Sequence, residues 1–276
     1  MKKILLVISL ISVLLLAGCN KNENINNVNV SKNVDNQQQE VIDNNQENVN
    51  VTKTADQRKQ ENISKLRIEN ISYLDSLPVI EDSSQATLRS KKEVLERALA
   101  SYVASNVAID YNWNRQDFEE SRDYFKTFMN NYGIDKSFLT DEETIMIFGT
   151  PTDEIALNTE WTLESSKVLF WMLGFLNDLD YPSESNICDA SELTKIILQY
   201  NSFDDMLLDA ELLSIEEILD YTDLYYRYHW ACRNKRVSDS STSIGNLSND
   251  IVLERRRALE WAIDSNEDWY NFDQST

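Results

Sequence analysis

The chain has 276 residues, of which 47 are acidic and 26 are basic, so its formal net charge is −21. Because phosphate contacts require clustered Lys and Arg side chains, this balance effectively excludes nucleic acid as a partner. The acidic surface favours a cationic partner or simply high solubility.

The first 19 residues, MKKILLVISLISVLLLAGC, have the layout of a secretory signal. Lys2 and Lys3 precede an apolar run over 4–18, which is shorter than the roughly 20 residues of a membrane-spanning helix. The end of the run, Leu16-Ala17-Gly18-Cys19, resembles the lipobox of bacterial lipoproteins. That resemblance implies cleavage after 1–18 and acylation of Cys19 with diacylglyceryl and palmitate-type chains, which together give stable anchoring. The prediction is a lipid-anchored protein on the extracytoplasmic side of the cell membrane; an ordinary cleaved signal or an uncleaved anchor are the alternatives.

The segment that follows has a different composition. Residues 20–54 contain twelve Asn and four Gln, with no aromatic residue and no Leu. Such a stretch buries too little apolar surface to offset the entropy of ordering it. We therefore expect 19–54 to be a lipidated, disordered linker.

Residues 55–276 are long enough for one domain with a sizeable core. The whole chain has only five Gly and three Pro, and so few turn-forming residues argue against a many-stranded sheet. The prediction is an all-α fold, a single multi-helix, bundle-like domain behind the linker.

Apolar spacing places the helices of this domain. In chain order we expect them at 55–75, 88–107, 118–132, a short stretch after 140, 161–176, 191–200, 215–236 and 246–263. Two capping boxes mark starts: Thr140-Asp141-Glu142-Glu143 and Ser214-Ile215-Glu216-Glu217. The aromatic tail at 269–272 is expected to dock back onto the domain.

The helix at 215–236 contains the single histidine of the chain, His229, within an aromatic stripe. A structural role is the expected one, ahead of ligand contact or catalysis, since nucleophilic catalysis needs a Ser or Cys beside the ring and an acid to orient it. Arg233, one turn later, disfavours a protonated ring. Asp223 and Arg227 are four residues apart and can pair.

The apolar stripe of the last helix runs through Arg255 and Arg256, so at least one guanidinium is expected to be partly buried. A buried arginine needs a paired carboxylate, and Glu164 or Asp223 on other helices are candidates. A structural ion-pair network is the first interpretation, and an anion or carboxylate site built from Arg227, Arg233 and Arg255 is the alternative.

Four blocks occur in a recognisable order: LRSKKEVLERALA (88–100), EWTLESSKVLFWMLG (160–174), DLYYRYHWACR (223–233) and VLERRRALEW (252–261). Together with the closing WYNFDQST (269–276), they resemble a bacterial family known as domain of unknown function 4272. The resemblance implies a helical domain and assigns no activity, substrate or catalytic residue. The matching residues are Glu164, Trp171, Arg227, His229, Trp230, Arg233, Glu254, Arg255 and Trp261.

Motifs for known chemistry are absent from the sequence. There is no glycine-rich phosphate loop, GxSxG elbow, HExxH zinc site or CxxC pair. A calcium-like start at Asp110 has Arg115 and Ser121 where glycine and glutamate are needed. We therefore expect no metal site and no cofactor. A bridge between Cys188 and Cys232 is permitted outside the cytoplasm, but spacing alone does not decide it.

The sequence thus favours a non-enzymatic helical module that binds an unknown protein or small molecule. The alternative is an enzyme of unknown reaction. Its pocket would be lined by a candidate polar cluster, for which we expect a structural role first: Glu164, Arg227, His229, Trp230, Arg233, Glu254 and Arg255.

Overall fold

The computed structural model describes residues 52–266, 268, 269, 275 and 276, and Thr52–Thr276 forms one compact unit. In this part of the chain there are nine α-helices and no strand, which confirms the predicted all-α fold. The helices are α2 (Ala55–Ile68), α3 (Lys91–Trp113), α4 (Phe118–Tyr132), α5 (Asp141–Phe148), α6 (Asp153–Met172), α7 (Ala190–Ile197), α8 (Phe203–Asp209), α9 (Ile215–Val237) and α10 (Asn249–Ile263). Short 3₁₀ turns lie at Lys136–Phe138 and Glu184–Asn186.

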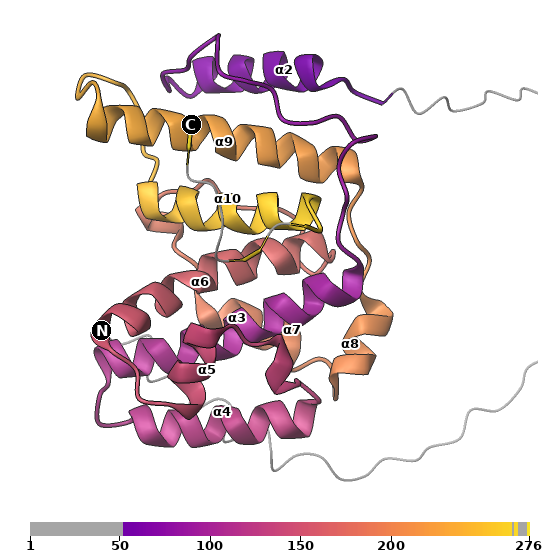
Figure 1. Ribbon diagram of the computed structural model, residues 1–276, viewed down its shortest axis with the longest axis vertical. Helices are drawn as coiled ribbons and strands as arrows, with labels where there is room; N and C mark the ends of the chain where they lie inside the picture. Colours follow the sequence, from indigo (N-terminus) through magenta and orange to yellow (C-terminus); the bar gives the residue numbers. More distant parts are fainter. Residues whose placement is uncertain (1–51, 267, 270–274) are drawn as a thin grey trace, which may run out of the picture. The chain divides into compact units, whose positions relative to one another are not determined.

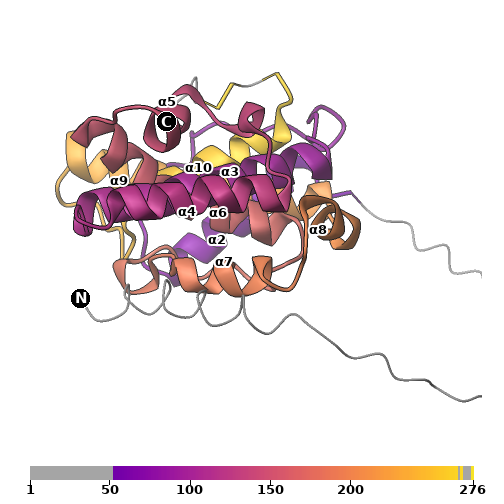
Figure 2. The ribbon, with the colours of Figure 1, turned by 90° about the horizontal axis from the view of Figure 1, so that it is seen from below.

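The helices pack in a sequence of layers that differs from their order in the chain. Figure 1 shows α2 on α9, α9 on α10, α10 on α6, α6 on α3 and α3 on α4. Figure 2, seen from the α4 end, shows α5 and α7 on opposite sides of α3 and α4. The last two long helices therefore separate α2 from the core formed by α3 and α6.

The contact between α3 and α6 is the centre of the core, and small residues allow these two helices to approach closely. Ala98, Ser101 and Ser105 of α3 and Ser166 of α6 are fully buried. The Ser166 hydroxyl donates to the Ala98 carbonyl at 2.8 Å, so its polarity is satisfied inside the core.

Several predicted helix ends differ from the structure; the central helix, expected at 161–176, spans Asp153–Met172. The first helix stops at Ile68 and not near 75, because Asn70 adopts a left-handed backbone (φ 56°) and the Ile71 amide turns back to the Leu66 carbonyl at 2.9 Å. The second helix continues to Trp113 instead of ending at 107, so the calcium-like stretch from Asp110 begins inside this helix.

The capping predictions are confirmed at one site and half confirmed at the other. Thr140 and Glu143 form the complete reciprocal box at the start of α5. Ser214 accepts the Glu217 amide, but the return bond is not among the contacts of the described residues. Gly133 ends α4 with a left-handed φ of 83°. The seven-residue helix α8 was not predicted, because it is too short for its apolar period to stand out.

The segments predicted to be signal and linker lie almost entirely outside the described residues, which begin at 52. Within the described part of the chain, no helix combines the length and the apolar character needed to cross a membrane. In the aromatic tail, Trp269 is buried edge-on against Trp261 with ring centroids 5.4 Å apart. Residues 270–272 of that tail lie outside the described residues.

Candidate functional site

The Arg255 guanidinium lies in a buried polar cluster between α10 and α6. Its Nε donates to Glu164 Oε2 at 2.8 Å, and Nη1 donates to the Asp180 carbonyl at 2.6 Å and to the Tyr225 hydroxyl at 3.2 Å. Arg255 is 0% exposed and Glu164 1%. Burial alone would lower the pKa of Arg255, but Tyr225 and Glu164 outweigh it and raise the pKa. The pairing of Arg255 with Glu164, one of the two candidates from the sequence, is therefore present.

The second buried pair, Arg227 with Asp223, lies within α9. Arg227 donates two hydrogen bonds to the Asp223 carboxylate, from Nε to Oδ2 at 2.8 Å and from Nη2 to Oδ1 at 2.6 Å. Asn62 of α2 adds a third bond to Asp223 Oδ2 at 2.9 Å. Because all three side chains are buried, this pair also holds α2 against α9.

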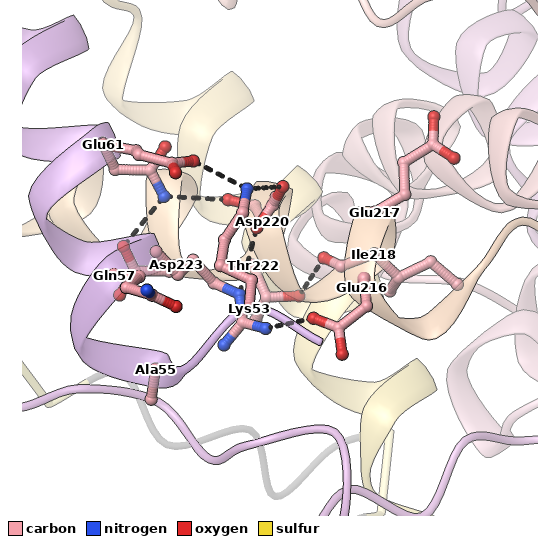
Figure 3. Close-up of polar contacts among 12 residues, drawn as sticks. Lys53, Ala55, Gln57, Glu61, Glu216, Glu217, Ile218, Asp220, Thr222 and Asp223 are labelled. Atoms are coloured by element: carbon pink, nitrogen blue, oxygen red, sulfur yellow. Dashed lines mark hydrogen bonds and ion pairs between the residues drawn. The ribbon is translucent and has the colours of Figure 1, made fainter. Parts of the chain in front are cut away.

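A third group of charges joins the same two helices and was missed by sequence reasoning. Arg58 of α2 is completely buried and donates to Glu216 at 2.9 Å and Asp220 at 3.1 Å, both on α9. Lys53, just before α2, contacts Asp220 and Glu61 at 2.7 Å each, as Figure 3 shows. A signal was available: Arg58 lies four residues before Asn62 and eight before Leu66, on the buried face of α2.

His229 faces α10, where its Nδ1 meets Nη1 of Arg256. Since a guanidinium only donates, Nδ1 must accept and is unprotonated. Burial, with Arg256, Arg233 and Arg236 nearby, lowers the pKa of His229 to about 4. The ring is therefore neutral at physiological pH. Arg233 disfavours its protonation, as expected from helical spacing, and Arg256 of α10, which contacts the ring, does so more strongly.

The remaining cluster residues lie apart from that contact. Trp230 is half-buried, and Arg233 Nη1 donates to the Thr276 carbonyl at 3.3 Å. Glu254 is buried on another face of α10, where it accepts the Ser165 hydroxyl at 3.2 Å and lies 3.2 Å from Arg257 Nη2. Burial raises the pKa of Glu254, and Arg257 and Ser165 only partly offset the rise.

The anion-site alternative required Arg227, Arg233 and Arg255 to converge. In the structure each donates to different acceptors inside the protein. None of the three lines either of the two pockets described below. Cys188 and Cys232 are both buried free thiols, so the permitted disulfide is not formed.

A further buried pair, Arg97 with Glu143, was also missed. Glu143 caps α5 through Thr140 and at the same time binds Nη2 of Arg97 on α3 with both carboxylate oxygens. Arg97 lies over the Trp269 ring at 4.8 Å from its centroid. This arrangement brings the carboxyl-terminal tryptophan, α3 and α5 together.

Beside Arg97 and Trp269 the surface is hollowed in two places. One hollow, which we call the acidic pocket, has a volume of about 510 Å³ and lies between α5, α6 and α10. Its charged lining is Glu142, Glu143, Asp250, Glu254 and Arg257. The other, of about 660 Å³, is lined by both signs of charge, including Arg89, Lys92, Glu93 and Asp268.

The chemistry available at the acidic pocket is that of carboxylates. Burial raises the pKa of Glu142, with Arg257 acting in the opposite direction. Among the described residues no three His, Cys, Asp or Glu side chains come close enough to hold a metal ion. Of the predicted cluster residues, only Glu254 lines this pocket.

A family model with the description "domain of unknown function (DUF4272)" matches residues 58–272. That range includes every helix of the described domain apart from the first turn of α2. Neither the curated proteins nor the solved structures that were compared gave a match.

Proposed function

This chain belongs to the DUF4272 family, and we propose that its helical domain is a non-enzymatic binding module held on the extracytoplasmic side of the cell membrane by a lipid on Cys19. The module binds a protein or small molecule, and its acidity favours a cationic partner. The lipid anchor is supported by the order of basic residues, apolar run and lipobox in the first 19 residues.

The observation that carries the proposal is that the buried side chains of the polar cluster bond to one another inside the domain. Arg227 and Arg255 are 1% and 0% exposed, and each holds a buried carboxylate with its guanidinium. His229 is neutral and engaged by Arg256. Groups that hold each other in this way stabilise the fold, whereas a catalytic group must reach a substrate.

One observation favours the alternative, an enzyme. Glu254 lines the acidic pocket, is buried and has a raised pKa, which are properties of a general acid. The two functions make different predictions for Glu254→Gln. In an enzyme the variant folds and loses turnover, whereas in a binding module no turnover exists to be lost.

The anchor is tested by expressing the full chain in bacteria with labelled palmitate and separating membranes from soluble material. We expect label and membrane association for the wild type and for Cys232→Ser, the control, since Cys232 is a buried free thiol. Cys19→Ser should abolish both. Label retained in Cys19→Ser would disprove acylation at this residue.

The binding role is tested by cross-linking on intact cells that display the full chain, followed by capture at low and at high salt. Recovery of a defined partner, weakened by salt, is the expected result because charge attraction is screened. Recovery of no partner, together with substrate turnover that Glu254→Gln abolishes, would establish the enzyme instead.

A further inference from the structure

We propose that the acidic pocket binds an organic cation, an ammonium or guanidinium group with a hydrogen-bond acceptor close beside it. The inference rests on the proposed binding function and names its site and ligand class. The pocket lies between the start of α5, the middle of α6 and the first half of α10, with Trp269 at its edge.

The charge of the pocket selects the sign of the ligand. Four carboxylates line it, those of Glu142, Glu143, Asp250 and Glu254. Arg97 neutralises Glu143 from α3, and Arg257 pairs with Glu254. Asp250 has no cationic partner among the contacts of the described residues and keeps the lining negative, so a cation gains from entering and an anion is repelled.

A buried hydroxyl without a partner is the second, independent observation. Thr159 lines the pocket and is 2% exposed, and its Oγ1 forms no hydrogen bond within the described part of the chain. Arg257 Nε, also in the lining, is buried without a partner as well. Buried polar atoms are normally satisfied, and an unsatisfied one costs free energy unless a ligand or ion completes it.

Thr159 Oγ1 and Arg257 Nε need different hydrogen-bonding groups from a ligand. The Thr159 hydroxyl can accept from a ligand N–H, while Arg257 Nε can only donate and needs a ligand acceptor. A cation with a carbonyl or hydroxyl nearby meets both needs, as a lysine or arginine residue of a peptide does. A free amine meets only the first.

The apolar part of the lining favours an organic cation over a metal ion. Trp161, half-buried in the lining, is a residue type whose indole ring attracts ammonium and guanidinium groups. Leu157, an exposed leucine of the same wall, provides surface for the methylene stem. The described carboxylates do not gather into a metal-binding group of three.

The test uses the full chain in a nonionic detergent and isothermal titration with three probes. N-acetyl-lysine methylamide carries the ammonium and the acceptors, cadaverine carries the ammonium alone, and N-acetyl-norleucine methylamide lacks the charge. We expect the lysine compound to bind and the norleucine compound not to bind. Binding of cadaverine at equal strength would assign the site to free amines, and weaker binding would assign it to a peptide side chain.

Matched variants place the binding in the pocket. Asp250→Asn removes a pocket carboxylate from the first turn of α10 and should weaken binding of the lysine compound by about tenfold. Asp204→Asn removes an exposed carboxylate from the first turn of α8, outside the pocket, and should leave binding unchanged. Equal affinities for both variants and the wild type would overturn the assignment to this pocket.

Thr159→Val separates a ligand contact from a structural role. Removing a buried, unpartnered hydroxyl should leave the melting temperature of the free protein equal or higher, and should weaken lysine binding about fivefold. A lower melting temperature with unchanged affinity contradicts the proposal. Absence of binding by any probe overturns the ligand class, while cell cross-linking and fractionation test the anchored module itself.

Discussion

The pair between Arg255 and Glu164 provides the sharpest test of the structural role of the buried cluster. In Arg255→Met the side chain keeps much of its length and loses its charge. Glu164 then keeps a single bond, from the Cys188 amide at 2.5 Å, and loses its Arg255 partner. The carbonyl of Asp180 and the hydroxyl of Tyr225 lose the same donor.

The expected cost follows from burial. Removing one partner of a buried pair typically costs about 3–5 kcal/mol, because the other charge is left in a medium that solvates it poorly. For a domain of this size that corresponds to a drop of about 6–20 °C in melting temperature. It is also a large part of the roughly 5–15 kcal/mol that holds a typical protein folded.

The assay is urea unfolding followed by tryptophan fluorescence, with Arg115→Met as the control. Arg115 pairs with Asp153, and their side chains are 57% and 87% exposed, so the control should lose at most about 1 kcal/mol. The double variant Glu164→Gln/Arg255→Met should lose less than the sum of its single variants, because no buried charge is left unpaired. Additive losses, or a cost for Arg255→Met no larger than that of the control, would refute the reasoning.

Three other predictions follow from the buried groups. Burial raises the pKa of both thiols, that of Cys232 to about 12, so neither Cys188 nor Cys232 should react with iodoacetamide at pH 8 until the protein is denatured. Intact mass should be the same with and without reductant, and a mass lower by two hydrogen atoms in the unreduced protein would reveal a disulfide. His229 has its pKa lowered to about 4, whereas the unfolded chain binds this proton near 6.5. The contribution of neutral His229 to the free energy of unfolding should therefore be fully present above pH 6.5, and about 3 kcal/mol of it should be lost as the pH drops towards 4. In thermal melts over this pH range, His229→Gln should make the melting temperature depend less on pH. An unchanged pH dependence would contradict the lowered pKa. Arg58→Met should cost about 1.5–3 kcal/mol and speed amide hydrogen exchange in α2 but not in α6, since Arg58 binds α2 to α9; equal exchange in both helices would argue against this local role.

The helical architecture could be predicted because its signals are local. Thr140 and Glu143 are three residues apart, and Asp223 and Arg227 are four apart, so helical geometry alone brings each pair together. Scarce glycine and proline likewise limit the number of turns before any packing is known.

The site could be predicted only in part, since it depends on which helices become neighbours. The partners of Arg58 are 158 and 162 residues away, and Glu143 is 46 residues from Arg97. In a chain with 47 acidic residues, every arginine has many possible partners along the sequence. Arg255 was the exception, because an arginine in an apolar stripe demands a partner and Glu164 lies in the buried central helix.

The carboxylates of the domain are of two kinds: some join two helices by pairing with a buried arginine, and others join none. Arg255 with Glu164, Arg58 with Asp220 and Arg97 with Glu143 each join two different helices. Sliding one helix by a turn, about 5.4 Å, would separate such partners, so we infer that they fix the register of helices whose apolar faces are alike. Asp250 has no guanidinium partner of this kind among the contacts of the described residues, and its one hydrogen bond is with its neighbour Asn249. A carboxylate that fixes no helix and faces a pocket is free to meet a ligand, and this is why the acidic pocket, rather than the larger buried cluster, is the place to look for function.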